Sequence, residues 1–145
     1  GQVTLVYKCR KAIELVLSNL PKGSLVGING FTCFAVYDAI QKTEMKVEYL
    51  DIEKGELNFS ADSLKKTNNL KAVIIQNTLG YPCDIAAIAK ICKEKKIMLI
   101  EDLAHSIGTR YQNGVEAGMV GDFVVLSFSQ DKIIDCVSGG ALIER

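Results

Sequence analysis

The sequence predicts an α/β domain in which helices cover both faces of a mostly parallel β-sheet, a three-layer α/β/α sandwich. Short apolar segments alternate with longer amphipathic segments along the whole chain, an order typical of parallel sheets. Several apolar segments, such as Ile97–Ile100, have no alternating polar residues, as expected of strands that are buried on both faces. A chain of 145 residues is long enough for one such domain with its own hydrophobic core.

The expected strands are short, rich in Val, Ile and Leu, and bounded by turn residues. They are Leu25–Ile28, Lys46–Asp51, Ala72–Gln76, Ile97–Ile100, Phe123–Leu126 and Ala141–Ile143. Glu53-Lys54-Gly55 is expected to close the second of them, and Asn113-Gly114 is typical of a tight hairpin turn between short pieces.

The expected helices have apolar residues at helical spacing and polar residues suited to begin them. They are Ala12–Leu20, a helix from about Thr32 to Thr43, a short helix from Ser60 or Asp62 to Thr67, and Asp84–Lys96. Thr32, Ser60 or Asp62, and Asp84 are the expected N-caps, because their side-chain oxygens can accept a hydrogen bond from a free backbone N–H.

Composition argues against several classes of function. The formal net charge is zero, so the surface has no basic excess to attract nucleic acid or an anionic membrane. The five cysteines are dispersed without C-x-x-C spacing, and the single His105 cannot complete a zinc set, so no metal site is expected. Dispersed thiols of odd number predict a reduced, cytoplasmic protein. Neither a dinucleotide-binding nor a P-loop glycine pattern occurs.

The first candidate for chemistry is the pair Glu101-Asp102, which ends an otherwise apolar strand. Ligands of parallel sheets bind beyond the carboxyl ends of the strands. A buried carboxylate is costly without a cation or a hydrogen-bond donor, and the ring nitrogen of a pyridine cofactor is one partner that fits. The alternative is that Asp102 caps the turn that begins at Leu103.

The second candidate is the segment that follows the strand Phe123–Leu126. Ser127 emerges from the sheet, where its hydroxyl could bind a phosphate oxygen, and Lys132 lies five positions later. A lysine in a desolvated site becomes a nucleophile for carbonyl groups. Taken alone, a lysine is more often a solvated surface residue.

The third candidate is the basic turn Lys8-Cys9-Arg10-Lys11 at the start of the first helix. Free backbone N–H groups and the positive end of the helix dipole favour a phosphate there, and Arg10 and Lys11 add charge. The alternative is a charged first turn that faces solvent. Because cations at a helix N-terminus oppose the dipole, the pattern favours an anionic ligand.

Together these segments resemble the DegT/DnrJ/EryC1/StrS sugar-aminotransferase family of fold type I pyridoxal-phosphate (PLP) enzymes. The segment from Glu101 to Gly108 is similar to the family's Glu-Asp-x-Ala-His/Gln-x-x-Gly. The family's Gly-Asp, Ser-Phe-x-x-x-Lys and Gly-Gly-Ala patterns recur in order at Gly121-Asp122, Ser127–Lys132 and Gly139–Ala141. Three positions depart from the family: Cys9 stands in place of a turn glycine, Cys33 in place of the aromatic that stacks on the cofactor ring, and Ser138 where many members have Glu.

The resemblance implies a role for each candidate residue toward pyridoxal 5'-phosphate. Lys132 would bond the cofactor and move protons, Asp102 would pair with the ring nitrogen, and His105 would lie beside the ring. The remaining cofactor-binding residues are Arg10, Lys11 and Ser127 at the phosphate, and Cys33 at the ring. With cysteine at that position, the stacking role is either lost or taken by Phe31 or Phe34.

The resemblance also implies an activity: transfer of an amino group from an amino acid, commonly glutamate, to a keto-sugar that is typically nucleotide-linked, in amino sugar biosynthesis. It implies small-molecule partners, a homodimer in the full-length form, and residues 1–145 as the PLP-binding large-domain core without the family's N-terminal arm and C-terminal small domain. Related sugar dehydratases have histidine in place of the cofactor-bonding lysine, so Lys132 favours transfer. The alternatives are a PLP enzyme of different outcome, such as a dehydratase, and a truncated or degenerate domain without catalysis.

Overall fold

A single twisted sheet organises the fold of the computed structural model, which describes residues 1–52 and 54–145. Its strands are β1 (Gln2–Val6), β2 (Leu25–Asn29), β3 (Lys46–Leu50), β4 (Leu70–Ile75), β5 (Met98–Asp102), β6 (Phe123–Ser127) and β7 (Gly140–Glu144). They form a seven-stranded sheet in the order β1-β7-β6-β5-β4-β2-β3. The strands from β2 to β6 are parallel, whereas β7 runs antiparallel to both β6 and β1.

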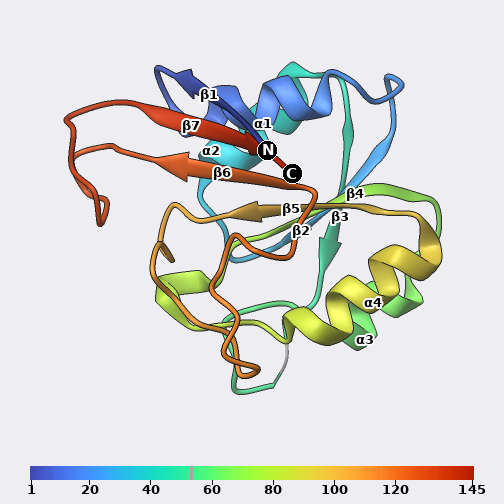
Figure 1. Ribbon diagram of the computed structural model, residues 1–145. Coiled ribbons are helices and arrows are strands. Elements are labelled where there is room, and N and C mark those ends of the chain that lie inside the picture. The colour runs from blue at the N-terminus through green and yellow to red at the C-terminus, as the bar shows by residue number, and fades with distance from the viewer. Residues whose placement is uncertain (53) are drawn as a thin grey trace.

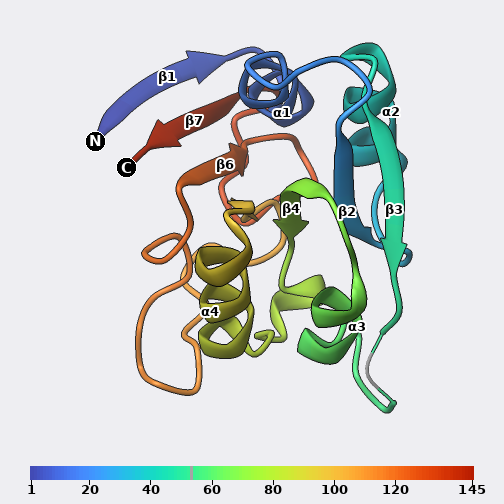
Figure 2. The ribbon, with the colours of Figure 1, turned by 90° about the vertical axis from the view of Figure 1, so that its right-hand side faces the viewer.

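Helices cover both faces of this sheet. They are α1 (Cys9–Leu17), α2 (Phe34–Lys42), α3 (Ala61–Lys66) and α4 (Ile85–Lys95), with a short 3-10 turn at Thr78–Gly80. Figures 1 and 2 show α1 and α2 on one side of the sheet and α3 and α4 on the other. The predicted three-layer α/β/α sandwich with a mostly parallel sheet is therefore confirmed.

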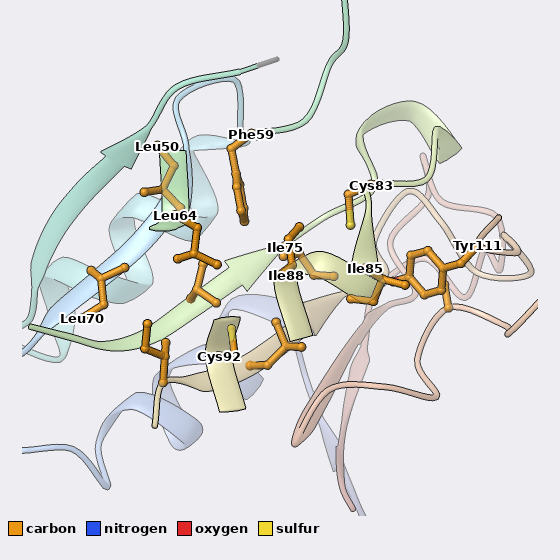
Figure 3. Packing of buried hydrophobic residues seen from close by; sticks show 14 of the residues in the cluster. Leu50, Phe59, Leu64, Leu70, Ile75, Cys83, Ile85, Ile88, Cys92 and Tyr111 are labelled. Atoms are coloured by element: carbon orange, nitrogen blue, oxygen red, sulfur yellow. The ribbon is translucent and has the colours of Figure 1, made fainter. Parts of the chain in front are cut away.

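Each helix pair packs on its own half of the hydrophobic core. The half beneath α3 and α4 includes Leu64 and Ile88, which Figure 3 shows. Leu99 of β5 belongs to the same half. The half beneath α1 and α2 includes Ile13 and Ile100. Because successive side chains of a strand point to opposite faces, Leu99 and Ile100 belong to different halves, and β5 contributes to both.

The helix starts agree with the sequence at two of the expected caps. The side chain of Ser60 accepts a hydrogen bond from the backbone N–H of Ser63 at 3.0 Å. That of Asp84 accepts from Ala87 at 3.1 Å. The expected cap at Thr32 is wrong: α2 begins after Cys33, which makes no side-chain capping bond, because the Thr32 hydroxyl donates to Gln76 Oε1 instead.

Two further features differ from the sequence analysis. Strand β1 was not expected; it pairs with β7, so the two ends of the chain lie side by side (Figure 1). Helix α1 begins at Cys9, within the basic turn expected at its start, but it ends at Leu17 and not at Leu20, the last residue of the apolar pattern. The Asn113-Gly114 turn is confirmed, since Gly114 N–H bonds to Tyr111 O at 2.8 Å between segments that pair at Arg110 and Glu116.

Glu53, one of the residues expected to close the strand at Lys46–Asp51, lies outside the described residues. Among the helices of the described part, none combines the length and the hydropathy needed to cross a membrane.

Candidate functional site

A cavity of about 210 Å3 lies at the carboxyl edge of the parallel strands. The strands β2, β4, β5 and β6 end there, and α1 and α2 begin there, which is where ligands bind in open α/β sheets. The lining residues are Lys8, Cys9, Arg10, Ile13, Cys33, Ala35, Val36, Gln76, Asp102, Ala104, His105, Ser127, Ser129, Asp131 and Lys132. All site residues predicted from the sequence except Lys11 line this one cavity.

Lys11 lies apart from the other predicted residues. Its ammonium is 2.9 Å from Glu14 Oε2, one helical turn further along α1, and it lines a separate surface hollow beside α2. The basic turn therefore presents Arg10, and not Lys11, to the cavity.

Asp102 is the buried acid of the cavity. It is the last residue of β5 and only 5% exposed. Its Oδ1 accepts a hydrogen bond from Ala104 N–H at 2.9 Å and lies 3.9 Å from the Cys9 thiol. Burial raises the pKa of Asp102, while the Ala104 N–H and the nearby His105 and Lys132 oppose that rise. Asp102 thus caps a turn, as the alternative reading proposed, and also lines the cavity.

Lys132 is a cavity residue and not a solvated surface lysine. Its side chain is 14% exposed. The ammonium lies 2.8 Å from Asp131 Oδ2 and 3.4 Å from Nε2 of His105. The loop after β6 therefore brings Lys132 to the same cavity as the residues that end β5.

Two helix N-termini border the cavity without side-chain caps. Lys8 precedes α1 and Cys33 precedes α2, and neither makes a capping bond, so first-turn N–H groups remain for a ligand. Arg10 adds a guanidinium at the same place, held 3.1 Å from Asp38. The hydrogen bond from Lys42 and, to a lesser extent, that from Arg10 lower the pKa of Asp38. Uncapped N-termini with a cation favour an anion.

Ser127 lines the cavity, and Gly140, its partner residue on β7, lies against the first turn of α1. Ser127 is buried, and its hydroxyl is 3.4 Å from that of Ser129. A Cβ at Gly140 would lie 2.6 Å from Leu126 O and 2.8 Å from Cys9 N, closer than real atoms approach. Glycine at this position therefore allows the first turn of α1 to lie directly against the sheet.

Glu101, the other carboxylate of the pair, has a different role. It points to the opposite face from Asp102 and is fully buried. Its oxygens accept hydrogen bonds from the Tyr111 hydroxyl at 2.7 Å and from the N–H groups of Gly118 and Val120 at 2.7 and 2.8 Å, with another from Gly121. Glu101 therefore fixes the loop before β6 and does not reach the cavity.

Sequence reasoning missed Gln76, which follows β4 and lines the cavity. Its amide donates to Phe31 O at 2.8 Å and to Thr78 Oγ1 at 2.9 Å, and accepts from Thr32. These bonds tie the loop before α2 to the end of β4. The expected strand Ala72–Gln76 included Gln76, whereas β4 ends at Ile75, so Gln76 is the first residue beyond the strand. The next residue, Asn77, donates to the Tyr111 hydroxyl instead.

The fold and the site define an α/β domain of the aminotransferase type. The structure of the aminotransferase TlmJ from Streptoalloteichus hindustanus matches 99% of this chain with a TM-score of 0.90 and 30% identity, over 40% of its own length. The particular family follows from the sequence: residues 3–145 match the DegT/DnrJ/EryC1/StrS aminotransferase family, and the chain belongs to it.

Two other similar proteins differ in the reaction that their names state. GDP-perosamine synthase of Vibrio cholerae is 32% identical over 146 residues, which cover 98% of this chain and 40% of that protein. The structure of the E. coli GDP-4-keto-6-deoxy-D-mannose-3-dehydratase with bound hydrated PLP matches with a TM-score of 0.88 and 26% identity, over 99% of this chain and 39% of that one. The chain spans about a third to two fifths of the length of the curated relatives it matches.

Proposed function

We propose that this protein is a PLP-dependent aminotransferase that moves an amino group from an amino acid to a nucleotide-linked keto-sugar. Glutamate is the proposed amino donor. The observation that carries the proposal is that Lys132 and Asp102, from the ends of different strands, line one cavity. Membership of the aminotransferase family and the similarity to GDP-perosamine synthase support the reaction and the sugar substrate.

The residues of the cavity fit the parts of the cofactor. Within the described part of the chain, the hydrogen bonds of the Asp102 carboxylate reach Oδ1, so Oδ2 can accept one from a protonated ring nitrogen. That cation would offset the burial that raises the pKa of Asp102. The uncapped starts of α1 and α2, with Arg10 and the Ser127 hydroxyl, suit a phosphate dianion.

The chemistry divides between the cofactor and the protein. When bound, PLP would supply an electron-withdrawing ring that stabilises negative charge on the reacting carbon. Asp102 Oδ2 would hold the proton of the ring nitrogen in place. Lys132 Nζ would bond the cofactor and carry a proton to and from the substrate carbon, with His105 Nε2 close enough, at 3.4 Å, to orient that amine.

Amino-group transfer is favoured over dehydration by Lys132 itself, because the related dehydratases have histidine where this chain has lysine. Product analysis with an amino donor and a keto-sugar distinguishes the two reactions. An aminated sugar is expected, and a deoxygenated keto-sugar without retained nitrogen would overturn the assignment.

Cofactor bonding can be tested apart from turnover. PLP added to the full chain should give a visible absorbance band, and borohydride reduction followed by mass spectrometry should place the cofactor on the peptide that contains Lys132. Lys132→Ala should lose both signals, because the variant lacks the amine proposed to bond the cofactor. Labelling of a different lysine, with Lys132 unmodified, would contradict the proposal.

Asp102→Asn separates bonding from catalysis. The variant should still attach PLP at Lys132, but conversion of the bound cofactor to its amine form by glutamate should slow by orders of magnitude, since an amide cannot hold the ring nitrogen protonated. Single-turnover absorbance measurements report this step. An unchanged rate would remove Asp102 from the mechanism.

The setting of the enzyme is part of the proposal. A cytoplasmic location is supported by the cysteines, all of which are free, as is usual in reducing compartments. A homodimeric full-length form is supported by the family resemblance, and sedimentation of the full-length protein tests it.

A further inference from the structure

The loop after β6 places a carboxylate directly against the amine of the proposed site. Asp131 Oδ2 lies 2.8 Å from Lys132 Nζ, and both side chains line the cavity. The two residues differ in exposure, since the side chain of Asp131 is 74% exposed and that of Lys132 is 14% exposed. The hydrogen bond from Lys132 lowers the pKa of Asp131, so this carboxylate stays charged over the neutral range.

Other charged and titratable groups surround Lys132 at greater distance or with weaker contact. They are His105, 3.4 Å away through Nε2, and Asp102, Cys9, Cys33, Lys8 and Arg10, which line the same cavity. In the described part of the chain, Asp131 is the carboxylate within ion-pair distance of Nζ.

We propose that Asp131 is a positioning residue that holds the Lys132 ammonium in the cavity and so sets how much free amine is available to a carbonyl group. A carboxylate partner favours the charged form of a lysine, whereas only the uncharged amine attacks carbonyls. Because Asp131 is at the exposed rim, it turns to solvent without desolvation cost when Lys132 loses its charge. The inference rests on the proposed function for the importance of Lys132, but its test needs no cofactor.

The test is reductive methylation of Lys132 by formaldehyde and a borohydride reductant, which methylate free amines. The rate is measured across the neutral and alkaline pH range. Mass spectrometry of digested full chain gives the extent for each lysine. Asp131→Asn should raise the rate at Lys132 about two- to fivefold near neutral pH, the scale of a partly exposed ion pair, and move its pH profile to lower pH. Asp131→Glu should return the profile toward that of the wild type.

Asp135→Asn is the matched control. Asp135 is on the same loop, but its carboxylate accepts from Val137 N–H at 2.8 Å and does not contact Lys132, so Lys132 reactivity should not change. Glu14→Gln checks the method, because Glu14 pairs with Lys11 at 2.9 Å, so the reactivity of Lys11 should change and that of Lys132 should not. Lys90, an exposed lysine of α4 on the opposite face of the sheet, is the internal standard in every digest.

The outcomes separate this inference from the proposed function. An unchanged profile in Asp131→Asn, or an equal change in Asp135→Asn, would overturn the role of Asp131, whatever the result with PLP. A selective change at Lys132 supports it. If PLP labels Lys132 but Asp131→Asn has no effect on methylation, the proposed function survives and the inference fails.

Discussion

The two helix pairs that cover the sheet differ in how their N-termini are satisfied. On one face, Ser60 and Asp84 cap α3 and α4 with their own side chains. On the other, α1 and α2 begin without side-chain caps at the cavity, after Lys8 and Cys33. The α3 and α4 layer therefore meets its hydrogen-bonding needs within the chain, whereas the α1 and α2 layer leaves donors for a ligand.

The same contrast occurs between neighbouring residues of β5. Glu101 points to the α3 and α4 face, where protein donors occupy both oxygens. Asp102 points to the α1 and α2 face, where Oδ1 alone has protein partners in the described part of the chain. One strand thus carries a carboxylate that stabilises the fold and another that is suited to bind a cofactor.

The largest expected effect tests the structural carboxylate. Glu101→Gln places an amide group against backbone N–H donors in a fully buried site, and we expect it to lower the free energy of unfolding by about 3 kcal/mol or more. Asp102→Asn should change it by less than about 1 kcal/mol at neutral pH. Urea unfolding of both variants measures the difference, and equal losses would remove the contrast between the two carboxylates.

A smaller effect concerns pH. Burial raises the pKa of Asp102 above its ordinary value of 3.8, so the folded state holds this proton more tightly than the unfolded state. The contribution of Asp102 to stability therefore falls as pH rises from 3.8 through the raised pKa. Asp102→Asn lacks this loss, so its unfolding free energy should fall less over that window than that of the wild type. If the unfolding free energies of the two proteins changed in parallel with pH, this role of Asp102 would be contradicted.

The smallest effect concerns the caps. Asp84→Ala should cost about 1 kcal/mol of stability, because the Ala87 N–H loses its partner.

Cys33→Ser adds a capping hydroxyl to α2, and we expect a gain in stability of about 0.5 kcal/mol. PLP binding should become weaker, since the cap competes for the same N–H groups. Thermal unfolding measures the change in stability, and titration with PLP measures the change in affinity. Unchanged PLP binding with increased stability would show that α2 does not face the phosphate.

The sequence was sufficient to predict the sandwich, since apolar strands such as Ile97–Ile100 and the caps at Ser60 and Asp84 are local signals. It did not indicate β1, a short edge strand whose apolar residues are not buried: Val3 and Leu5 are 61% and 78% exposed. The antiparallel direction of β7 depends on pairing between distant segments, which local patterns do not encode.

The site was predictable where chemistry and strand ends coincide, as at Asp102, Ser127 and Lys132. Lys11 shows the limit: its type and spacing suit an anion, but the helix turns it toward Glu14 and away from the cavity. Gln76 was missed because an amide carries no charge, and its contacts with Thr32 and Phe31 cross more than forty positions of the chain.

The close approach at Gly140 bears on how stiff the cavity is. Leu126 O and Cys9 N both lie within 2.8 Å of where a Cβ of residue 140 would be. There is therefore no room for a side chain between β7 and the first turn of α1. The position of β7 therefore dictates where the α1 amides point. A single added methyl group at residue 140 would displace those amides as a unit, and no side-chain rotation could absorb the shift.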